Sequence, residues 1–368
     1  MAQARYIMVG GFLGAGKTTA ILQIAERLKA EGRRVGLITN DQSVGLVDTA
    51  MLGARDFPVE EITGGCFCCK FNSLLEAAQN LTRDAQPDVF IAEPVGSCTD
   101  LKATVSYPLR RMYGEDYSIA PLSVLVDPLR AMRILGLEKG KNFSEKVIYI
   151  YLKQLEEAEI IVVNKCDLLS KAQLDALTAA LQSRFPGKPI QHVSARQGTN
   201  LDAWMQSIAS AELAHGQSMD VDYDVYAEGE ALLGWMNCTA TLQAEEVFNG
   251  NEFVQQLAQR LQNQLSAASA EVAHLKMTLT PDAGNDLAVL NLVRNDVQPE
   301  LSHALAEPLL AGELIVNLRA EVDPEFLRDA TVQALEASAK TTKLSATVDH
   351  LEAFRPGRPT PTHRLARS

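Results

Sequence analysis

The stretch GFLGAGKTT, residues 11–19, decides the fold of this chain of 368 residues. It satisfies the pattern G-x-x-x-x-G-K-[ST] between an apolar run at 6–9 and a helical pattern that follows directly. Glycines let backbone N–H groups surround a phosphate, a helix N-terminus adds a positive dipole end, and the lysine and threonine can reach phosphate and Mg²⁺. The expected phosphate-binding residues are Gly11, Gly14, Ala15, Gly16, Lys17, Thr18 and Thr19.

Beyond this stretch, short apolar runs alternate with helical patterns. Most of the runs are apolar throughout, which is typical of strands that helices cover on both faces. We therefore expect an α/β fold of the P-loop NTPase class, with a mostly parallel sheet covered by helices on both faces. The expected strands lie at 6–9, 35–39, 59–62, 89–92, 122–126, 160–163 and 190–193.

A second, smaller domain of α+β type is expected after an acidic linker at 213–230. Apolar and polar residues alternate at 236–242 and 314–320, which predicts strands with one solvent-exposed face. Phe253 begins a helical repeat, and Asp323 before Pro324 predicts the start of another helix. The expected divisions are a P-loop domain at 1–212, the linker, the second domain at 231–350 and a basic tail rich in Pro and Arg at 351–368.

The charge balance argues against nucleic acids and membranes as partners. The chain has 34 Lys and Arg against 46 Asp and Glu, a formal net charge of −12, whereas binding to polyanions requires a basic face. No apolar run approaches the length of a membrane span, and the first apolar run is too short for a signal peptide. We expect a cytoplasmic protein whose partners are small molecules or other proteins.

The tetrapeptide Asn164-Lys165-Cys166-Asp167 follows the predicted strand at 160–163, where a loop that reads a base would lie. The Asp167 carboxylate can accept hydrogen bonds from guanine N1–H and N2–H₂, a pair of donors that adenine lacks. Asn and Asp are also common in turns, so this pattern indicates GTP only together with the phosphate-binding loop. Ser194 and Ala195, after the next strand, are expected to contact the base from the other side.

Glu93 ends another predicted strand, and Gly96 follows at a distance that suits an N–H group sensing a γ-phosphate. Glu93 is expected to hold Mg²⁺ with Thr18 or to place the attacking water, and an acid that caps a turn is the alternative. Asp41, after the strand at 35–39, is a second candidate for the magnesium shell. The expected hydrolytic centre comprises Lys17, Thr18, Asp41 and Glu93.

Three of the six cysteines, Cys66, Cys68 and Cys69, follow two glycines and precede a helical pattern. Thiolates near a helix N-terminus suit a soft or borderline cation such as Zn²⁺. Three ligands do not complete a tetrahedral structural site, which favours transient binding with a further ligand from elsewhere. A buried turn of small residues and a thiol redox switch are the alternatives. The isolated cysteines are expected to be packing residues: Cys98, Cys166 and Cys238.

Four motifs in this order resemble the CobW, HypB and UreG family of metal-centre GTPases, most closely its CobW branch. They are GFLGAGKTT, the Gly-Cys-x-Cys-Cys run at 65–69, Glu-Pro-Val-Gly at 93–96 and Asn-Lys-Cys-Asp at 164–167. The resemblance implies hydrolysis of GTP to GDP coupled to the handling of Zn²⁺ or Co²⁺, ahead of Ni²⁺, with the three thiolates as ligands. It also implies a client metalloprotein or cofactor enzyme and a nucleotide-dependent homodimer.

Two features depart from the family pattern. The run Asn40-Asp41-Gln42-Ser43-Val44 stands where the CobW branch usually has Asn-Glu-Phe-Gly-Glu, so that one carboxylate is shortened and the other is replaced by Val44. The sequence also lacks the His-rich tract of many relatives, which argues against metal storage.

We therefore expect a GTP-hydrolysing metallochaperone or an activator of a metal-centre enzyme. A nucleotide-switched module that remodels a corrinoid- or nitrile-hydratase-type client, without delivering metal through its cysteines, is the alternative from another class. A P-loop kinase of small molecules is a third hypothesis, but it leaves the run from Asn164 to Asp167 unexplained.

Overall fold

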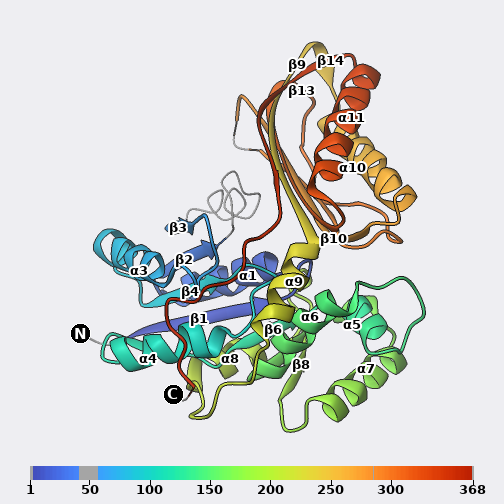
Figure 1. Cartoon of the computed structure of the whole chain (residues 1–368). Helices are drawn as coiled ribbons and strands as arrows, with labels where there is room; N and C mark the ends of the chain where they lie inside the picture. Colours follow the sequence, from blue (N-terminus) through green and yellow to red (C-terminus); the bar gives the residue numbers. More distant parts are fainter. Residues whose placement is uncertain (1–2, 41–56, 285, 367–368) are drawn as a thin grey trace. The chain divides into compact units, whose positions relative to one another are not determined.

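The computed structural model describes residues 3–40, 57–284 and 286–366. These residues divide into two compact units, whose helices and strands are labelled in Figure 1. The first unit contains the described residues up to 229 together with 358–366, and the second contains those from 230 to 357. No helix in the described ranges has the length and apolar character that crossing a membrane requires.

The first unit is built on a parallel sheet with strand order β3-β2-β4-β1-β6-β7-β8, and the short strand β5 also pairs with β1. Strands β2, β4, β6 and β7 are buried along their whole length, which requires cover on both faces. Each strand expected in this part of the sequence is present. The strands are β1 (Ala4–Gly11), β2 (Val35–Asn40), β3 (Val59–Ile62), β4 (Val89–Glu93), β5 (Tyr117–Ile119), β6 (Ser123–Val126), β7 (Ile160–Val163) and β8 (Ile190–His192).

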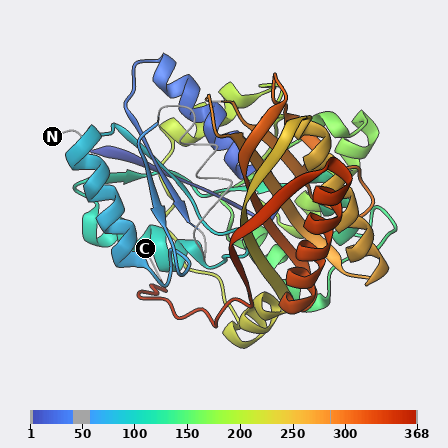
Figure 2. The same ribbon diagram turned by 90° about the horizontal axis from the view of Figure 1, so that it is seen from above.

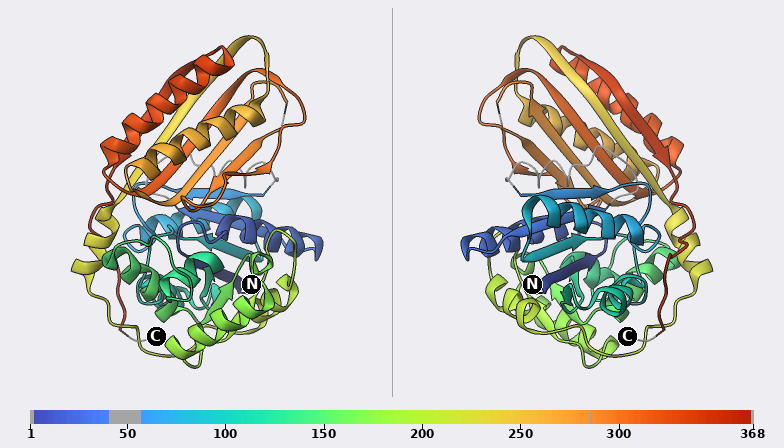
Figure 3. Two further views of the ribbon diagram at one scale, coloured as in Figure 1. Left: turned by 90° about the vertical axis from the view of Figure 1, so that its right-hand side faces the viewer. Right: turned by 90° about the vertical axis from the view of Figure 1, so that its left-hand side faces the viewer.

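Helices connect these strands and cover the sheet, as Figure 3 shows. Helix α1 begins at Lys17, directly after the glycine-rich loop, as expected. Trp204 of α8 is fully buried and donates its indole N–H to Ser123 Oγ at 3.0 Å. The helices are α1 (Lys17–Ala30), α3 (Phe71–Ala85), α4 (Tyr107–Tyr113), α5 (Pro128–Ile134), α6 (Glu145–Glu157), α7 (Lys171–Arg184) and α8 (Leu201–Ser210), with a π-helical turn at Lys102–Ser106 and a 3₁₀ turn at Cys166–Leu168.

Helix α9 (Tyr223–Leu232) lies in the segment that we expected to be a linker. The Asp222 carboxylate orders its first turn by accepting the N–H groups of Asp224 and Val225 at 2.9 and 3.1 Å. Tyr226 and Glu230 are buried. The acidic residues of this stretch therefore cap and flank a helix whose apolar residues show no clear helical period.

The second unit is an antiparallel sheet with strand order β12-β11-β10-β13-β9-β14 and two long helices that pack on it (Figure 3). Asp323 caps α11 by accepting the Glu325 N–H, with Pro324 in the first turn, as expected. The elements are β9 (Leu233–Phe248), α10 (Gly250–Ala267), β10 (Glu271–Pro281), β11 (Ala288–Leu292), β12 (Glu300–His303), β13 (Leu309–Glu321), α11 (Pro324–Thr342) and β14 (Leu344–Phe354).

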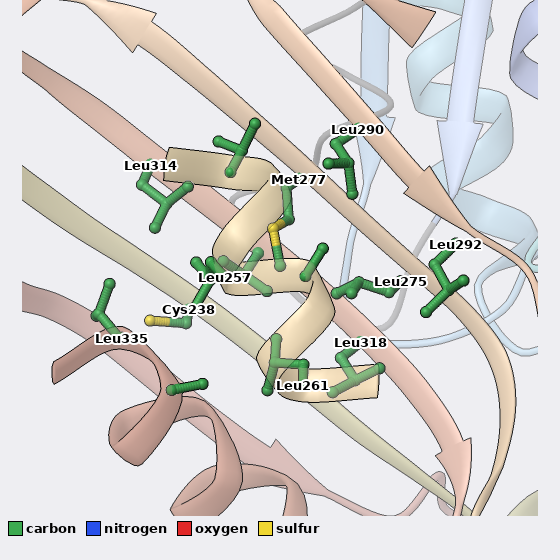
Figure 4. Packing of buried hydrophobic residues seen from close by; sticks show 14 of the residues in the cluster. Cys238, Leu257, Leu261, Leu275, Met277, Leu290, Leu292, Leu314, Leu318 and Leu335 are labelled. Atoms are coloured by element: carbon green, nitrogen blue, oxygen red, sulfur yellow. The ribbon is translucent and has the colours of Figure 1, made fainter. Parts of the chain in front are cut away.

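A continuous apolar core joins the sheet and helices of this second unit. Figure 4 shows Leu257 and Leu261 of α10 lying over side chains of the sheet, among them Cys238. Burial raises the pKa of the Cys238 thiol to about 11, as expected for a packing residue. Trp235 of β9 is also buried, and the Arg319 guanidinium lies 4.2 Å from the centre of its ring.

Strand β14 continues to Phe354 because its residues stay paired with β9, so it extends past the boundary expected at residue 350. The residues from 358 onward belong to the first unit. Figures 1 and 2 draw them in red as an extended segment without helix or strand. We call residues 358–366 the C-terminal strap.

Candidate functional site

The glycine-rich loop between β1 and α1 has a backbone that requires glycine. Gly11 and Gly16 have φ of 135° and 85°, in the region that favours glycine. A Cβ on Gly11 would lie 2.4 Å from the carbonyl oxygen of Leu125, and one on Gly16 would lie 2.6 Å from Nδ2 of Asn164. The loop therefore lies against β6 and the segment after β7, and it leads directly into the N-terminus of α1, where backbone N–H groups favour a phosphate.

Two side chains at the start of α1 meet the end of β4. The Thr18 hydroxyl donates to Glu93 Oε1 at 3.1 Å, and Lys17 Nζ lies 4.0 Å from the same oxygen. All three side chains are buried. Hydroxyl and carboxylate oxygens are donors that Mg²⁺ prefers, so Thr18 and Glu93 fit this ion.

Gly96 lies close to the glycine-rich loop. A Cβ at this position would meet Leu13 Cδ2 at 2.8 Å and Leu13 N at 3.1 Å. The Gln154 amide, which is itself buried, donates to the Gly96 carbonyl at 2.9 Å. The segment after β4 is therefore fixed between the glycine-rich loop and α6.

The segment after β7 is tied to the glycine-rich loop by two of its side chains. Asn164 Nδ2 donates to the Ala15 carbonyl at 2.9 Å, and Lys165 Nζ donates to the Gly14 carbonyl at 2.8 Å. Asn164 Oδ1 in turn accepts the Ala195 N–H at 3.0 Å. Asp167 is exposed, so its carboxylate is open to a base.

Ser194 and Gln197 complete the surroundings of this carboxylate. Ser194 is buried, and its hydroxyl accepts the Gln197 N–H at 3.3 Å. The Gln197 side chain donates to Asp167 Oδ2 at 3.4 Å. The segments after β7 and β8 thus lie side by side, as the sequence predicts for a base-reading site.

Asp127 connects the end of β6 to α5 and to Lys165 in the segment after β7. Its carboxylate caps α5 by accepting the Arg130 N–H at 2.9 Å, and it accepts a hydrogen bond from Lys165 Nζ at 2.8 Å. Burial opposes ionisation of Asp127, but the charge and hydrogen bond of Lys165, together with the N–H and charge of Arg130, outweigh it, so the pKa of Asp127 is lowered. Asp127 therefore holds the lysine that reaches the glycine-rich loop.

The thiols of Cys66, Cys68 and Cys69 form a cluster in the loop between β3 and α3, which we call the thiol loop (residues 63–70). Their sulfur atoms all lie within 4.8 Å of one another. Cys66 Sγ lies 3.2 Å from Cys69 Sγ, and Cys68 Sγ lies 3.7 Å from it. All three thiols are free, Cys66 and Cys68 are buried and Cys69 is half-buried. A compact set of free thiols fits a soft or borderline cation.

Hydrogen bonds inside the cluster favour one thiolate. Donation from Cys68 and then from Cys69 lowers the pKa of Cys66 well below its usual value. The same bonds, with burial, raise the pKa of Cys68 and of Cys69. The remaining protons must leave when a cation binds, because thiolates are the metal ligands.

Asn40, the last residue of β2, positions the thiol loop, and the sequence analysis did not assign it a role. Its amide donates to the Ile62 and Gly65 carbonyls at 3.0 and 2.7 Å, and its Oδ1 accepts the Phe67 N–H at 2.8 Å. A buried amide with all three bonds made fixes the loop to the sheet. Asp41 and Val44, both discussed above, lie outside the described residues.

The C-terminal strap crosses the thiol loop. The Thr360 N–H donates to Cys69 Sγ at 3.2 Å, and Thr362 donates through its N–H to the Cys68 carbonyl at 2.8 Å and through its hydroxyl to the Cys69 carbonyl at 3.0 Å. Further along the strap, Arg364 donates to the buried carboxylate of Asp100 at 2.7 Å.

Comparison with protein families and curated proteins identifies relatives of this chain. A family model described as CobW/HypB/UreG, nucleotide-binding domain, matches residues 5–191. The zinc chaperone YeiR of Escherichia coli is 30% identical over 189 residues, which cover 50% of this chain and 53% of that protein. The zinc chaperone CobW of Sinorhizobium is 28% identical over 212 residues, 52% and 58% of the two chains. The chain thus spans about half the length of the curated relatives it matches.

Matches among solved structures have lower sequence identity. HypB from Helicobacter pylori in complex with nickel is 19% identical with a TM-score of 0.40, over 55% of this chain and 84% of that one. The Zn(II)-bound YjiA GTPase from E. coli is 14% identical with a TM-score of 0.37, over 91% and 99% of the two chains.

Proposed function

The chain belongs to the CobW/HypB/UreG family, and from this premise we propose that it is a GTPase that binds a transition metal and passes it to a client metalloprotein or cofactor enzyme. The observation that carries the proposal is the cluster of free thiols at Cys66, Cys68 and Cys69, within 4.8 Å of one another. This cluster follows β3, at the same edge of the parallel sheet as the glycine-rich loop after β1.

In the proposed hydrolysis, the backbone of the glycine-rich loop and Lys17 bind the phosphates of GTP. Thr18 and Glu93 would hold Mg²⁺, which supplies positive charge to the phosphoryl group in transfer. Glu93 or Asp41 would place the attacking water. The N–H of Gly96, whose carbonyl accepts from Gln154, would respond to the γ-phosphate.

The proposed base specificity rests on Asp167. Its exposed carboxylate would accept both guanine donors, with Asn164 and Lys165 fixing the segment to the glycine-rich loop. Ser194 and Ala195 would contact the base from the neighbouring segment. A site built for two donors rejects a base that lacks them, because its own acceptors would be left unpaired.

The proposed cargo is Zn²⁺ or Co²⁺, ahead of Ni²⁺, because clustered thiolates favour soft or borderline cations in tetrahedral sites. Curated relatives named as zinc chaperones support Zn²⁺. We further propose a cytoplasmic location and a homodimer that forms in the GTP state, since loops ordered by a γ-phosphate create new surface.

An anaerobic titration tests this function. The full chain is titrated with Zn²⁺, Co²⁺ and Ni²⁺ in Mg-GTP and in Mg-GDP, alongside Cys66→Ala and Cys69→Ala. We expect tighter binding with GTP and a loss of at least about tenfold in affinity in each variant, since a ligand is removed. Cys238→Ala, which lies in the core of the second unit, is the control and should bind as the native chain does.

One observation favours a second candidate, a nucleotide-switched module that remodels a corrinoid- or nitrile-hydratase-type client. Cys66 and Cys68 are buried and the strap covers Cys69, which suits thiols that sense or dock rather than deliver. In that case client activation would persist in Cys66→Ala and Cys69→Ala. Metal affinity that is equal with both nucleotides would exclude the delivery function.

A further inference from the structure

We propose that Cys98 supplies a fourth thiolate to the metal that Cys66, Cys68 and Cys69 bind, so that the site is a closed tetrahedron of four sulfur atoms within one chain. This inference rests on the proposed metal-binding function and names the residue that completes its site. From the sequence alone Cys98 is expected to be a packing residue, because it lies far along the chain from the other three.

Contacts between thiols bring Cys98 into the cluster. Its side chain hydrogen-bonds with the thiols of both Cys66 and Cys68, and it is not part of a disulfide. Its exposed fraction is 1%, so the Cys98 thiol is shielded from solvent, like the thiols of Cys66 and Cys68. Structural zinc sites use four ligands in tetrahedral arrangement, and four thiolates are a common set.

The backbone around Cys98 is held in place from both sides. Its N–H donates to the Val95 carbonyl at 2.9 Å, and the buried amide of Gln154 donates to its carbonyl at 2.8 Å. The same amide donates to the Gly96 carbonyl at 2.9 Å. A ligand fixed in this way costs little ordering entropy when the metal binds.

The position of Cys98 couples the metal to the nucleotide. Gly96, two residues earlier, packs on Leu13 of the glycine-rich loop. A shift of this segment when the γ-phosphate is lost would withdraw one of the four sulfurs and leave a three-thiolate site with an open position. The nucleotide would then set the number of sulfur ligands, and with it the rate of metal release.

X-ray absorption at the zinc edge of the full chain in a non-hydrolysable Mg-GTP analogue counts these ligands. We expect four sulfur neighbours at about 2.3 Å, and three with one lighter atom in Cys98→Ser. Cys238→Ser, a second buried cysteine, should keep four. Three sulfurs in the native chain, or an unchanged count in Cys98→Ser, would overturn the inference.

The count on the native chain decides the question even where Cys98→Ser does not fold. A chain that binds no zinc at all contradicts the proposed function itself. The two failures are therefore distinguishable.

A different set of contacts carries a second inference. We infer that the C-terminal strap is a cover on the thiol loop that must lift before metal passes to a client. Cys69 is the one half-buried thiol of the cluster, and it is the sulfur that the Thr360 N–H contacts. Thr362 adds two hydrogen bonds to the backbone of the same loop.

Arg364 holds the strap down. Its guanidinium donates to Asp100, which is 1% exposed and also accepts the Tyr223 hydroxyl at 2.8 Å. The next residue, Leu365, donates its N–H to the Ala103 carbonyl at 2.8 Å. An ion pair with one partner buried is worth more than an exposed pair, so Arg364 is the contact whose loss should free the strap.

Two rates measured on Arg364→Ala test this cover. We expect modification of Cys69 by a thiol reagent, and transfer of bound Zn²⁺ to a chromophoric chelator, to rise at least severalfold. Arg358→Ala is the matched control, because Arg358 lies on the same strap but contacts Asp224, an exposed carboxylate.

Thr362→Val, which removes an exposed hydroxyl with little risk to folding, should give a smaller rise. Unchanged thiol reactivity in both Arg364→Ala and Thr362→Val, or an equal rise in Arg358→Ala, would refute the cover. The thiol assay needs no metal, so it tests the strap independently of the proposed function.

Discussion

The glycine-rich loop and the thiol loop lie at the same edge of one parallel sheet, since each follows the carboxyl end of its strand, yet they are held differently. Direct side-chain bonds to two other segments fasten the glycine-rich loop, from Thr18 to Glu93 at the end of β4 and from Asn164 and Lys165 in the segment after β7. The thiol loop depends on one buried amide, Asn40, and on the C-terminal strap. The glycine-rich loop is thus held by segments of its own sheet, whereas the thiol loop also contacts the C-terminal strap, the segment that we propose to be a cover. This difference suits a protein in which a bound nucleotide governs access to a metal.

The largest expected effect comes from a substitution in the glycine-rich loop alone. Lys17→Ala removes the buried cation beside Glu93. We expect GTP hydrolysis, followed by phosphate release, to fall by about a hundredfold or more, because a charge that stabilises the phosphoryl group is lost. Binding of Co²⁺ without nucleotide should stay as in the native chain. If both fall together, the two loops are one cooperative site.

The base-reading segment gives the next largest effect. Asp167→Asn replaces an acceptor pair by an amide, and we expect the preference for GTP over ATP in competitive binding to fall at least about tenfold. Asp175→Asn, an exposed acid on α7 paired with Lys171, is the control. Equal displacement of GTP by ATP in the native chain would instead indicate the small-molecule kinase hypothesis.

Asn40→Ala tests the thiol loop while leaving the glycine-rich loop unchanged. The Ile62 and Gly65 carbonyls and the Phe67 N–H lose their partner, so we expect the free energy of unfolding to fall by about 2–3 kcal/mol and metal affinity to fall with it. Affinity for GTP should change little. Urea denaturation and metal titration measure the two effects, and a native-like metal affinity would show that the strap alone positions the thiol loop.

The smallest expected effect concerns the pH dependence of stability. It comes from Glu157, the last residue of α6, which is repelled by Asp100. Burial, and then repulsion from Asp100, raise the pKa of Glu157 to about 8 from the usual 4.5. The folded chain therefore binds this proton more tightly than the unfolded chain, and its contribution to stability is lost as the pH rises through this window.

The free energy of unfolding of the native chain should fall between pH 6 and pH 8. In Glu157→Gln this fall should be smaller by about 2 kcal/mol. Urea denaturation at the two pH values checks this. An unchanged slope would mean that another group titrates in this range.

The sequence predicts those parts of the protein that local patterns determine. The strands of the first sheet, the helix after GFLGAGKTT and the Asp323 cap of α11 each depend on neighbouring residues, and the structure contains all of them. The contacts of Asn40 with the thiol loop span 22 to 27 residues, and that of Thr360 with Cys69 spans 291. No periodicity encodes such contacts, because they exist only once the sheet has brought the segments together.

Helix α9 and Cys98 are two further features that local sequence patterns do not predict. The helix lies in an acidic stretch whose capping carboxylate, Asp222, resembles a linker residue when the fold is unknown. Cys98 stands alone in the sequence and therefore predicts packing. The ligand role that we propose for it rests on its contacts with Cys66 and Cys68 in the folded chain.

The two tryptophans of the chain offer a way to watch each unit separately. Trp204 is buried in the first unit beside Ser123, and Trp235 is buried in the second beneath Arg319. Each unit thus carries its own intrinsic fluorophore. In Trp204→Phe the tryptophan emission would come from the second unit alone, and in Trp235→Phe from the first. Following this emission during denaturation of the intact chain would show the order in which the two units unfold.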